Sequence, residues 1–449
     1  MRRFTLIVTA LLMAVVSMAQ QKEPRQIELT QEDRLLVENN NNFAFRLFQQ
    51  AHTQESMILS PLSITYALGM LNNGAAGRTQ REINEVLGFG VAGADAINRF
   101  CYKLLTESTT LDEETKVMIA NTIFLNNHWD YQLKKPFVEK AKQYYNATPE
   151  ACDFYNGETL DVINKWASDH TEQMIKEVLS RDEFNVVAVS YLLNAIYFKG
   201  AWSNKFDLAN TKEESFNGGG KVPMMHLPIN DLGGGKEFRY TENDLYQAIE
   251  LPYGNGAYLM TIYLPRKGKT VGDVVQKMDG KSWRLVGHEA IVDLKLPRFE
   301  TDTDVDLVPI MSALGMPTAF DRGNAEFPEF CNYPVYIALM KQVAKIKVNE
   351  EGTEAAAVTV IGVEKSAMPN YAEFHANRPF LYTISEQSSG AIFFIGQYMG
   401  DGTSGIGDAT PQMNNEGVKA EKLYNLQGQR LQAPPAKGPY IKGGRKVMR

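Results

Sequence analysis

Hydrophobic residues recur at helical spacing in the first part of the chain, between polar positions that would face solvent. Residues 32–50 carry this pattern, which predicts an amphipathic helix packed on a core. A second helix is expected to begin after Ser60 and to run to about Leu71, because serine is a good N-cap and Pro61 suits the first helical turn. Further helices are predicted at 79–87, 137–145, 159–179 (one helix or two) and 304–314.

Short, continuous hydrophobic runs alternate with these helices and predict strands. The run at 186–198 is rich in β-branched and aromatic residues, as expected of a central strand that is buried on both faces. Residues 248–251 and 258–264 should form a hairpin around Asn255-Gly256, a strong turn signal. Other strands are predicted at 117–125, 290–296, 335–348, 380–384 and 391–395. The sequence therefore predicts a mixed α+β fold built on a large sheet.

The segment from residue 350 to residue 370 favours no single structure. Its acidic and alanine residues favour helix, whereas the Val-Thr-Val-Ile run at 358–361 favours strand, so the segment could belong to two structures. The small and polar residues that follow, up to Pro369 and Asn370, are typical of an exposed loop. A potential strand that leads into an exposed loop suggests a bait for another protein.

The N-terminus has the pattern of a secretory signal peptide. Two arginines precede an apolar run at 4–16 and the small residues before Ala19, which predicts cleavage after Ala19. A membrane anchor is the weaker alternative, because the run is shorter than the roughly 20 residues that a bilayer requires. No cysteine lies at the cleavage site, and no other apolar stretch has spanning length. The mature chain is therefore expected to be exported, secreted to the cell exterior or kept in the periplasm.

Composition is that of a globular protein and excludes some functions. Of 449 residues, 44% are hydrophobic and 22% are charged, and the net charge of −7 argues against a nucleic-acid surface. The chain has only three cysteines, Cys101, Cys152 and Cys331, which are too few to stabilise so long a chain by disulfide bonds. Because the count is odd, at least one thiol stays free in a monomer. The fold must therefore be stabilised by its core.

The sequence lacks the motifs of common enzymes. There is no HExxH pattern, no paired ligand spacing among the histidines and no GxSxG nucleophile motif. The glycine clusters at 218–220 and 233–235 are not followed by the Lys-Ser or Lys-Thr of a phosphate-binding loop. The sequence therefore argues against an enzyme and suggests no metal or other cofactor. The six histidines are His52, His128, His170, His226, His288 and His375.

The composition changes at Gly400. Residues 400–417 lack periodicity and are rich in Gly, Thr, Asn and Pro, which predicts a linker. Residues 401–449 contain eight basic and four acidic residues, so the tail is basic whereas the body is acidic. We therefore divide the chain into a signal peptide at 1–19, a main domain at 20–399, and a linker and tail at 400–449.

Several motifs together resemble the serpins, a family of serine protease inhibitors. EEGTEAAAVT at 350–359 resembles the hinge that precedes the serpin reactive centre loop. Each block alone is weak, but the ordered set covers about residues 28–399 and is specific. The other blocks, in serpin order, are NFAFRL at 42–47, SPLSI at 60–64, GAAGRT at 74–79, ANTIF at 120–124, INKW at 163–166, NAIYFKGAW at 194–202, VPMM at 222–225, LPRF at 296–299 and NRPF at 377–380.

The resemblance implies a serpin fold with three sheets, eight or nine helices, and a reactive centre loop at about 350–376 outside the largest sheet. It also implies suicide inhibition, in which a protease cleaves the loop and the hinge inserts into the large sheet before the acyl-enzyme hydrolyses. The expected partner is a serine protease, and the chain is expected to act as a monomer. A non-inhibitory serpin that serves as a binding or carrier module is the alternative.

The hinge residues fit this implied insertion. In a strand, Thr353, Ala355, Ala357 and Thr359 would share one face, and all four are small and uncharged. Glu354 would lie on the other face, so insertion would bury no unpaired carboxylate. A capped surface helix, the alternative for this segment, would not need this segregation. The hinge is assigned to Glu350, Gly352, Thr353, Glu354, Ala355, Ala356, Ala357, Val358 and Thr359.

The loop spacing of the family places the reactive bond between Ser366 and Ala367. Ser366 would then enter the specificity pocket of the protease, which suits elastase-like or subtilisin-like enzymes. A shift of one residue would make Lys365 the bait and favour trypsin-like enzymes, whose pocket is acidic. Both residues remain candidates, with Ser366 preferred.

Two features depart from the family pattern or lie outside it. Gln342 replaces the usual histidine in the shutter region, where the sheet opens, and is expected to hydrogen-bond with Ser60, Ser63 or Asn194. The basic tail resembles C-terminal extensions of exported Bacteroidetes proteins, which suggests a sorting or surface-association element, and a dispensable tail is the alternative. No dense Lys and Arg helix supports a heparin-like cofactor site.

Overall fold

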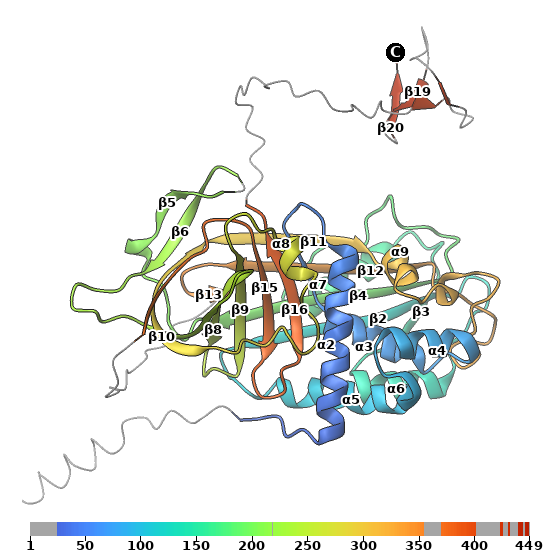
Figure 1. Cartoon of the computed structure of the whole chain (residues 1–449). Coiled ribbons are helices and arrows are strands. Elements are labelled where there is room, and N and C mark those ends of the chain that lie inside the picture. The colour runs from blue at the N-terminus through green and yellow to red at the C-terminus, as the bar shows by residue number, and fades with distance from the viewer. Residues whose placement is uncertain are drawn as a thin grey trace, which may run out of the picture. The chain divides into compact units, whose positions relative to one another are not determined.

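A six-stranded sheet runs across the main body of the computed structural model (Figure 1). The structure describes residues 25–217, 219–353 and 370–400, together with four short strands between 423 and 448. Within the six-stranded sheet the order is β11-β12-β13-β4-β2-β3. The strands are β2 (Lys116–Asn126), β3 (Glu150–Cys152), β4 (Ser190–Ala201), β11 (Phe299–Asp306), β12 (Leu339–Val348) and β13 (Gly352–Thr353).

A ten-stranded sheet forms the other half of the β-structure. Its order is β1-β16-β15-β9-β8-β7-β10-β6-β5, and β14 pairs with β10 from the side. The ten-stranded sheet has two portions, which join where β7 pairs with β10. Counted separately, these two portions and the six-stranded sheet are the three expected sheets. The strands are β1 (Met57–Leu59), β5 (Lys212–Ser215), β6 (Lys221–Leu227), β7 (Glu237–Glu242), β8 (Tyr246–Tyr253), β9 (Tyr258–Pro265), β10 (His288–Pro297), β14 (Tyr371–His375), β15 (Phe380–Glu386) and β16 (Ile392–Tyr398).

Helix α3 (Pro61–Asn72) connects the two sheets, because it contacts β16 of one and β2 and β4 of the other. The helix begins as predicted: Ser60 is the N-cap, its hydroxyl accepts from the Ser63 N–H, and Pro61 opens the first turn. Every residue of α3 is buried. The other helices are α2 (Gln31–Ala51), α4 (Gly77–Val86), α5 (Gly93–Ser108), α6 (Lys135–Tyr145), α7 (Thr159–His170), α8 (Val271–Val275) and α9 (Val308–Ala313), which with α3 makes eight α-helices among the described residues.

Strand β4 is the central strand that the apolar run predicts. It lies between β2 on one side and β12 and β13 on the other. Leu192 and Ile196 belong to the main core, whereas the alternating residues Leu193 and Ala195 belong to a second core on the opposite face, which α7 covers. Both faces of the strand are therefore buried, which explains why its sequence is continuously hydrophobic.

The prediction of a helix at 304–314 is wrong for residues 304–306. Residues up to Asp306 belong to β11, which pairs along its whole length with β12, and helix α9 begins only at Val308. Thr301 and Thr303 are buried and alternate with exposed acidic residues, so the segment follows the period of a strand. Other boundaries also differ: β4 begins at Ser190 rather than at 186, and β12 begins at Leu339 rather than at 335. The helical prediction at 159–179 holds only for α7, which ends at His170, and residues 171–179 form turns instead of more helix.

The hairpin around Asn255-Gly256 is confirmed, because β8 and β9 pair as far as Tyr253 and Tyr258. Helix α5 and strands β6, β7 and β14 were not predicted. Residues Met1–Thr403 and Ser404–Arg449 form two separate units. In the second unit, β17 (Leu423–Tyr424), β18 (Arg430–Leu431), β19 (Pro439–Lys442) and β20 (Arg445–Met448) form an antiparallel sheet of order β18-β17-β19-β20.

Candidate functional site

The candidate site is the place where the hinge meets the six-stranded sheet. Gly352 and Thr353 form strand β13, which is inserted between two longer strands: Thr353 pairs with Val348 of β12 and with Gly200 of β4. Beyond this point β12 and β4 pair directly and in parallel, from Leu339 opposite Tyr191 to Lys345 opposite Tyr197. The sheet therefore already holds the first residues of an added strand, and separation of β4 from β12 would make room for the rest.

Gly352 is required by the geometry of the insertion. Its φ is +146°, which lies outside the region that other residues readily adopt, and an added Cβ would lie 2.2 Å from the carbonyl oxygen of Gly200. The chain turns here between Asn349 and the sheet: the Gly352 N–H donates to the Asn349 carbonyl at 3.2 Å, and the Asn349 N–H donates to the Gly352 carbonyl at 2.9 Å.

Thr353 is fixed by buried aromatic side chains. Its hydroxyl lies 2.9 Å from the hydroxyl of Tyr253, and only 1% of the residue is exposed. Tyr253 stacks on Trp202 with ring centroids 4.4 Å apart, and the indole N–H of Trp202 donates to the Asn349 carbonyl at 2.9 Å. Burial raises the pKa of Tyr253, so the phenol stays neutral. The inserted threonine therefore lies in a buried, hydrogen-bonded position, where an unpaired charged side chain would be costly.

Glu350 anchors the chain just before the insertion. Arg298 holds its carboxylate with two nitrogens, at 2.5 Å to Oε1 and 3.1 Å to Oε2, and the Thr211 hydroxyl donates to Oε1 at 2.7 Å. Burial alone would raise the pKa of Glu350, but these hydrogen bonds and the guanidinium charge overcome that effect and lower it. The exposed neighbour Glu351 pairs with Lys205 at 2.7 Å.

The predicted shutter residues lie together in the buried centre of the molecule. Gln342 on β12 accepts from the Ser60 N–H at 2.9 Å, and its amide donates to the Ser60 carbonyl at 3.1 Å and to Asn194 Oδ1 at 2.5 Å. Asn194 on β4 in turn donates to the hydroxyl of Ser63 and to Asn121. The expected hydrogen bonds of Gln342 are therefore formed with Ser60 and Asn194, and Ser63 joins through Asn194. This network links α3 to the two strands that would have to separate.

A second polar contact on β12 was not predicted. The Lys341 ammonium, only 2% exposed as a side chain, pairs with Glu183 at 2.6 Å and with Asp304 at 2.9 Å. Burial would raise the pKa of Glu183, but hydrogen bonds from Lys341 and Ser180 and the lysine charge lower it to about 2. Lys341 thus ties β12 to its neighbour β11 and to the loop before β4.

Other predicted positions of the site lie outside the described residues. These are the later hinge residues and the reactive bond: Glu354, Ala355, Ala356, Ala357, Val358, Thr359, Lys365, Ser366 and Ala367. The roles of Arg298, Tyr253, Trp202 and Lys341 were missed from the sequence. Arg298 and Trp202 do occur in the LPRF and NAIYFKGAW blocks, but nothing in the sequence pairs them with Glu350 or Asn349.

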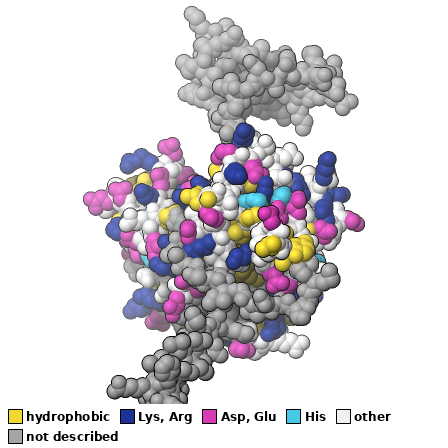
Figure 2. Space-filling model, turned by 90° about the vertical axis from the view of Figure 1, so that its left-hand side faces the viewer, with side chains coloured by type: hydrophobic (Ala, Val, Ile, Leu, Met, Phe, Trp, Pro, Cys, Tyr) yellow, Lys and Arg dark blue, Asp and Glu magenta, His cyan; other side chains and the backbone are white. Residues whose placement is uncertain are grey.

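Metal-ligand clusters and membrane-spanning helices are absent from the described part of the chain. Within 25–217, 219–353 and 370–400, no group of three or more His, Cys, Asp or Glu side chains could hold a metal ion. No helix in the same residues is both long and apolar enough to cross a bilayer. On the face in Figure 2, Lys and Arg side chains are interspersed with Asp and Glu, so this face has no dense basic field.

Comparison with known proteins gives a consistent result. The family model described as Serpin (serine protease inhibitor) matches residues 38–400. Neuroserpin of Gallus gallus is 30% identical over 367 residues, which covers 79% of this chain and 88% of the relative. Serpin B4 of Homo sapiens is 31% identical over 392 residues, covering 81% and 98%. The native structure of the thermophilic serpin tengpin superimposes with a TM-score of 0.74 at 25% identity, covering 84% of this chain and 96% of tengpin.

Proposed function

Because this chain belongs to the serpin family, we propose that it is an inhibitor of serine proteases that acts as a suicide substrate. The protease cleaves the reactive centre loop and forms an acyl-enzyme, and the hinge then inserts fully between β4 and β12. Insertion carries the attached protease across the sheet and distorts the protease before the ester bond of the acyl-enzyme is hydrolysed. The family to which the chain belongs is one of protease inhibitors and not of enzymes.

The position of β13 carries this proposal. Gly352 and Thr353 occupy the first place of an added strand, antiparallel to both β4 and β12, so insertion needs only to continue along a path that has begun. Each further residue adds ladder hydrogen bonds, and each inward-facing residue also buries a small side chain, which drives the reaction. Thr353 faces the core, as the assignment of Thr353, Ala355, Ala357 and Thr359 to one inward face requires.

The closed sheet opposes premature insertion. Gln342 and Asn194 join β12 directly to β4, while Ser60 connects Gln342 to α3 and Ser63 connects Asn194 to it. We assign to this network the role of a shutter that must open once per inhibition event. Arg298 and Glu350 act at the entrance, where they fix the start of the hinge immediately before β13.

The bait is proposed to be Ser366, with the reactive bond between Ser366 and Ala367. An elastase-like or subtilisin-like protease would accept this serine, whereas a trypsin-like protease would cleave after Lys365. The chain is further proposed to be exported after cleavage at Ala19, as a Bacteroidetes-type secreted or periplasmic serpin. The main domain would then be 20–399, and 400–449 would serve as a linker and a basic sorting or surface-association tail.

Incubation with elastase and with trypsin tests the inhibitory function. A covalent complex that survives denaturing electrophoresis supports it, whereas complete cleavage of the loop without any complex refutes it and leaves a carrier or binding module. The carrier alternative has a structural precedent. Thyroxine-binding globulin, solved in complex with thyroxine, is similar to this chain with a TM-score of 0.71 and 25% identity. Mass spectrometry of the released C-terminal peptide distinguishes Ser366 from Lys365.

Thr353→Arg tests the insertion step itself. A guanidinium at this fully buried position costs several kcal/mol, so the variant should be cleaved as a substrate with little complex formed. Thr353→Ser keeps the hydroxyl and should retain inhibition. Glu351→Arg introduces the same side chain two residues earlier, where the native side chain is 53% exposed, and should also retain it. Undiminished complex formation by Thr353→Arg would refute the inward assignment.

A further inference from the structure

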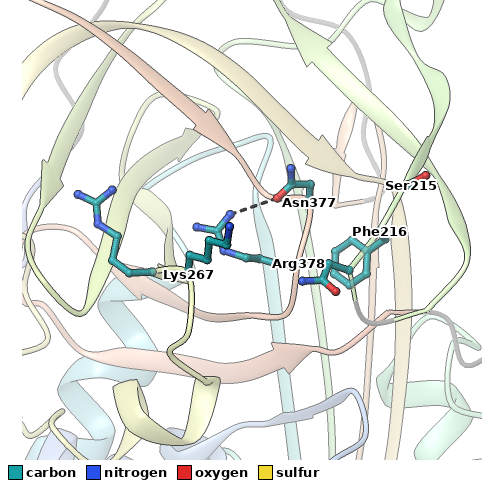
Figure 3. Close-up of a pocket in the computed structure, with 7 residues that line it drawn as sticks. Ser215, Phe216, Lys267, Asn377 and Arg378 are labelled. Carbon is teal, nitrogen blue, oxygen red and sulfur yellow. Dashed lines mark hydrogen bonds between the residues drawn. The ribbon is translucent and has the colours of Figure 1, made fainter. Parts of the chain in front are cut away.

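A basic hollow lies among segments that flank strands of the ten-stranded sheet. It has a volume of about 690 Å3 and is lined by three short segments: the end of β5, the loop after β9, and the link from β14 to β15 (Figure 3). Its lining residues are Ser215, Phe216, Asn217, Arg266, Lys267, Asn377 and Arg378. Three of the seven carry a positive charge, and none carries a negative one.

The positive charges in the hollow are not balanced equally. Arg266 is neutralised by Glu242, whose carboxylate lies 3.1 Å from a terminal guanidinium nitrogen, and its Nε donates to the Asn243 carbonyl at 2.9 Å. In contrast, no described carboxylate lies within 4 Å of the charged nitrogens of Arg378 or Lys267. Two neighbouring cations without a counter-ion attract an anion.

The guanidinium of Arg378 is held in place before any ligand arrives. Its Nε donates to the Pro265 carbonyl at 2.8 Å, and one terminal nitrogen donates to Asn377 Oδ1 at 3.1 Å. Among the described residues the second terminal nitrogen has no hydrogen-bond partner. The segment that follows β5 is also held in place, because the Asn217 N–H donates to the Asn377 carbonyl at 2.8 Å. A preorganised donor loses little conformational freedom on binding.

The environment of Arg378 strengthens its interaction with an anion. The side chain is half-buried, and burial lowers its pKa, with a further lowering from the charge of Arg266. The guanidinium nevertheless stays protonated at neutral pH. A partly desolvated cation interacts more strongly with an anion than one in bulk water does.

We propose that this hollow is a binding site for a phosphate or sulfate group, held by Arg378 and Lys267. A tetrahedral oxyanion can accept from the open nitrogen of Arg378 on one side and from the Lys267 ammonium on the other. The buried ring of Phe216 and the aliphatic stems of the two basic side chains provide apolar walls, against which the organic part of a phosphate ester could pack.

The site has a structural consequence that does not depend on protease inhibition. Asn377 and Arg378 join β14 to β15, and β14 follows the loop region directly. An anion bound to Arg378 and to Lys267 would connect this link to the loop after β9. Binding should therefore stabilise the folded protein, because a ligand of the native state raises the free energy of unfolding by mass action.

Titration of the full chain with inorganic phosphate and with phenyl phosphate tests the proposal. Isothermal calorimetry and thermal unfolding are measured at constant ionic strength, balanced with chloride. We expect saturable binding and a rise in Tm, with affinity lowered about ten-fold or more in Arg378→Gln and in Lys267→Gln. Lys267 is exposed, so its variant keeps the test valid if Arg378→Gln fails to fold. Lys269→Gln, an exposed lysine of the same loop outside the hollow, should bind as the unaltered chain does.

The two probes distinguish the source of the anion. Tighter binding of phenyl phosphate than of inorganic phosphate indicates a site for an ester, whereas equal binding indicates a site for the free ion, and both results support the site. The absence of saturable binding would overturn the proposal. Equal binding by all three variants would overturn it as well, because it would show that the anion binds elsewhere.

Discussion

Replacement of Gln342 by methionine should destabilise the closed sheet through hydrogen bonds that cannot be replaced. Gln342 is fully buried and makes three hydrogen bonds through its amide. Methionine has a similar volume but no amide, so the change removes polar contacts without leaving a large cavity. The effect is therefore a measure of the polar network at the centre of the sheet.

The magnitude follows from the groups that lose their partner. The Ser60 carbonyl keeps a second donor, the Ile64 N–H at 3.1 Å, so it remains satisfied. The Ser60 N–H and Asn194 Oδ1 would be left buried without a partner. Each such group costs about 1–3 kcal/mol, and the gain from burying methionine offsets part of this, so we expect a loss of about 3 kcal/mol in the free energy of unfolding.

Guanidinium unfolding followed by tryptophan fluorescence measures this loss. Gln276→Met is the matched control, because its native side chain is exposed, and it should change the free energy of unfolding by less than about 0.5 kcal/mol. Gln342→His should recover part of the stability, since an imidazole still offers a donor and an acceptor. A loss in Gln342→Met no larger than that of the control would refute the reasoning.

Three further predictions concern charges and thiols. Glu183 has a pKa lowered to about 2, so its pairing with Lys341 stabilises the fold fully above its unfolded pKa, about 4.5, and is lost as the pH falls towards 2; the acid unfolding transition should therefore be less steep in Glu183→Gln over that range. Glu350→Gln should lower the free energy of unfolding by about 1–2 kcal/mol, because Arg298 loses its charged partner at a position partly open to solvent. The Cys152 thiol has a pKa raised to about 12 by burial and by nearby Glu150 and Asp153, and the other two cysteines are buried; a thiol reagent at pH 8 should therefore react slowly with the native protein and with three thiols after denaturation.

Each of these predictions has a matched comparison. Asp169→Gln removes an exposed carboxylate that pairs with Lys165 and should leave the acid transition unchanged. Glu351→Gln removes the neighbouring, more exposed carboxylate, so a loss as large as that in Glu350→Gln would contradict the anchoring role of Glu350. A thiol that reacts rapidly in the native protein would contradict either the burial of Cys101 and Cys331 or the raised pKa of Cys152.

The sequence by itself determined those helices and strands that are specified by neighbouring residues, through a cap or through a regular pattern of hydrophobic positions. Ser60 and Pro61 specify the start of α3 through a cap and a fixed φ, and the apolar run before Ala201 specifies a strand that only a doubly covered sheet can bury. The ordered serpin blocks gave the family and therefore the topology, including pairings that no local pattern contains. Gln342 could be linked to Ser60 and Asn194 only through that resemblance.

Only the tertiary structure decided which distant side chains meet. Arg298 and Glu350 lie 52 residues apart, and Tyr253 and Thr353 lie 100 apart, so no spacing rule could join them. The Asp residues of β11 look compatible with a helix in isolation, and it is the pairing with β12 that makes the segment a strand. Long-range pairing and burial depend on the whole fold, whereas capping and periodicity depend on a few neighbouring residues, and this difference separates what could be predicted from what could not.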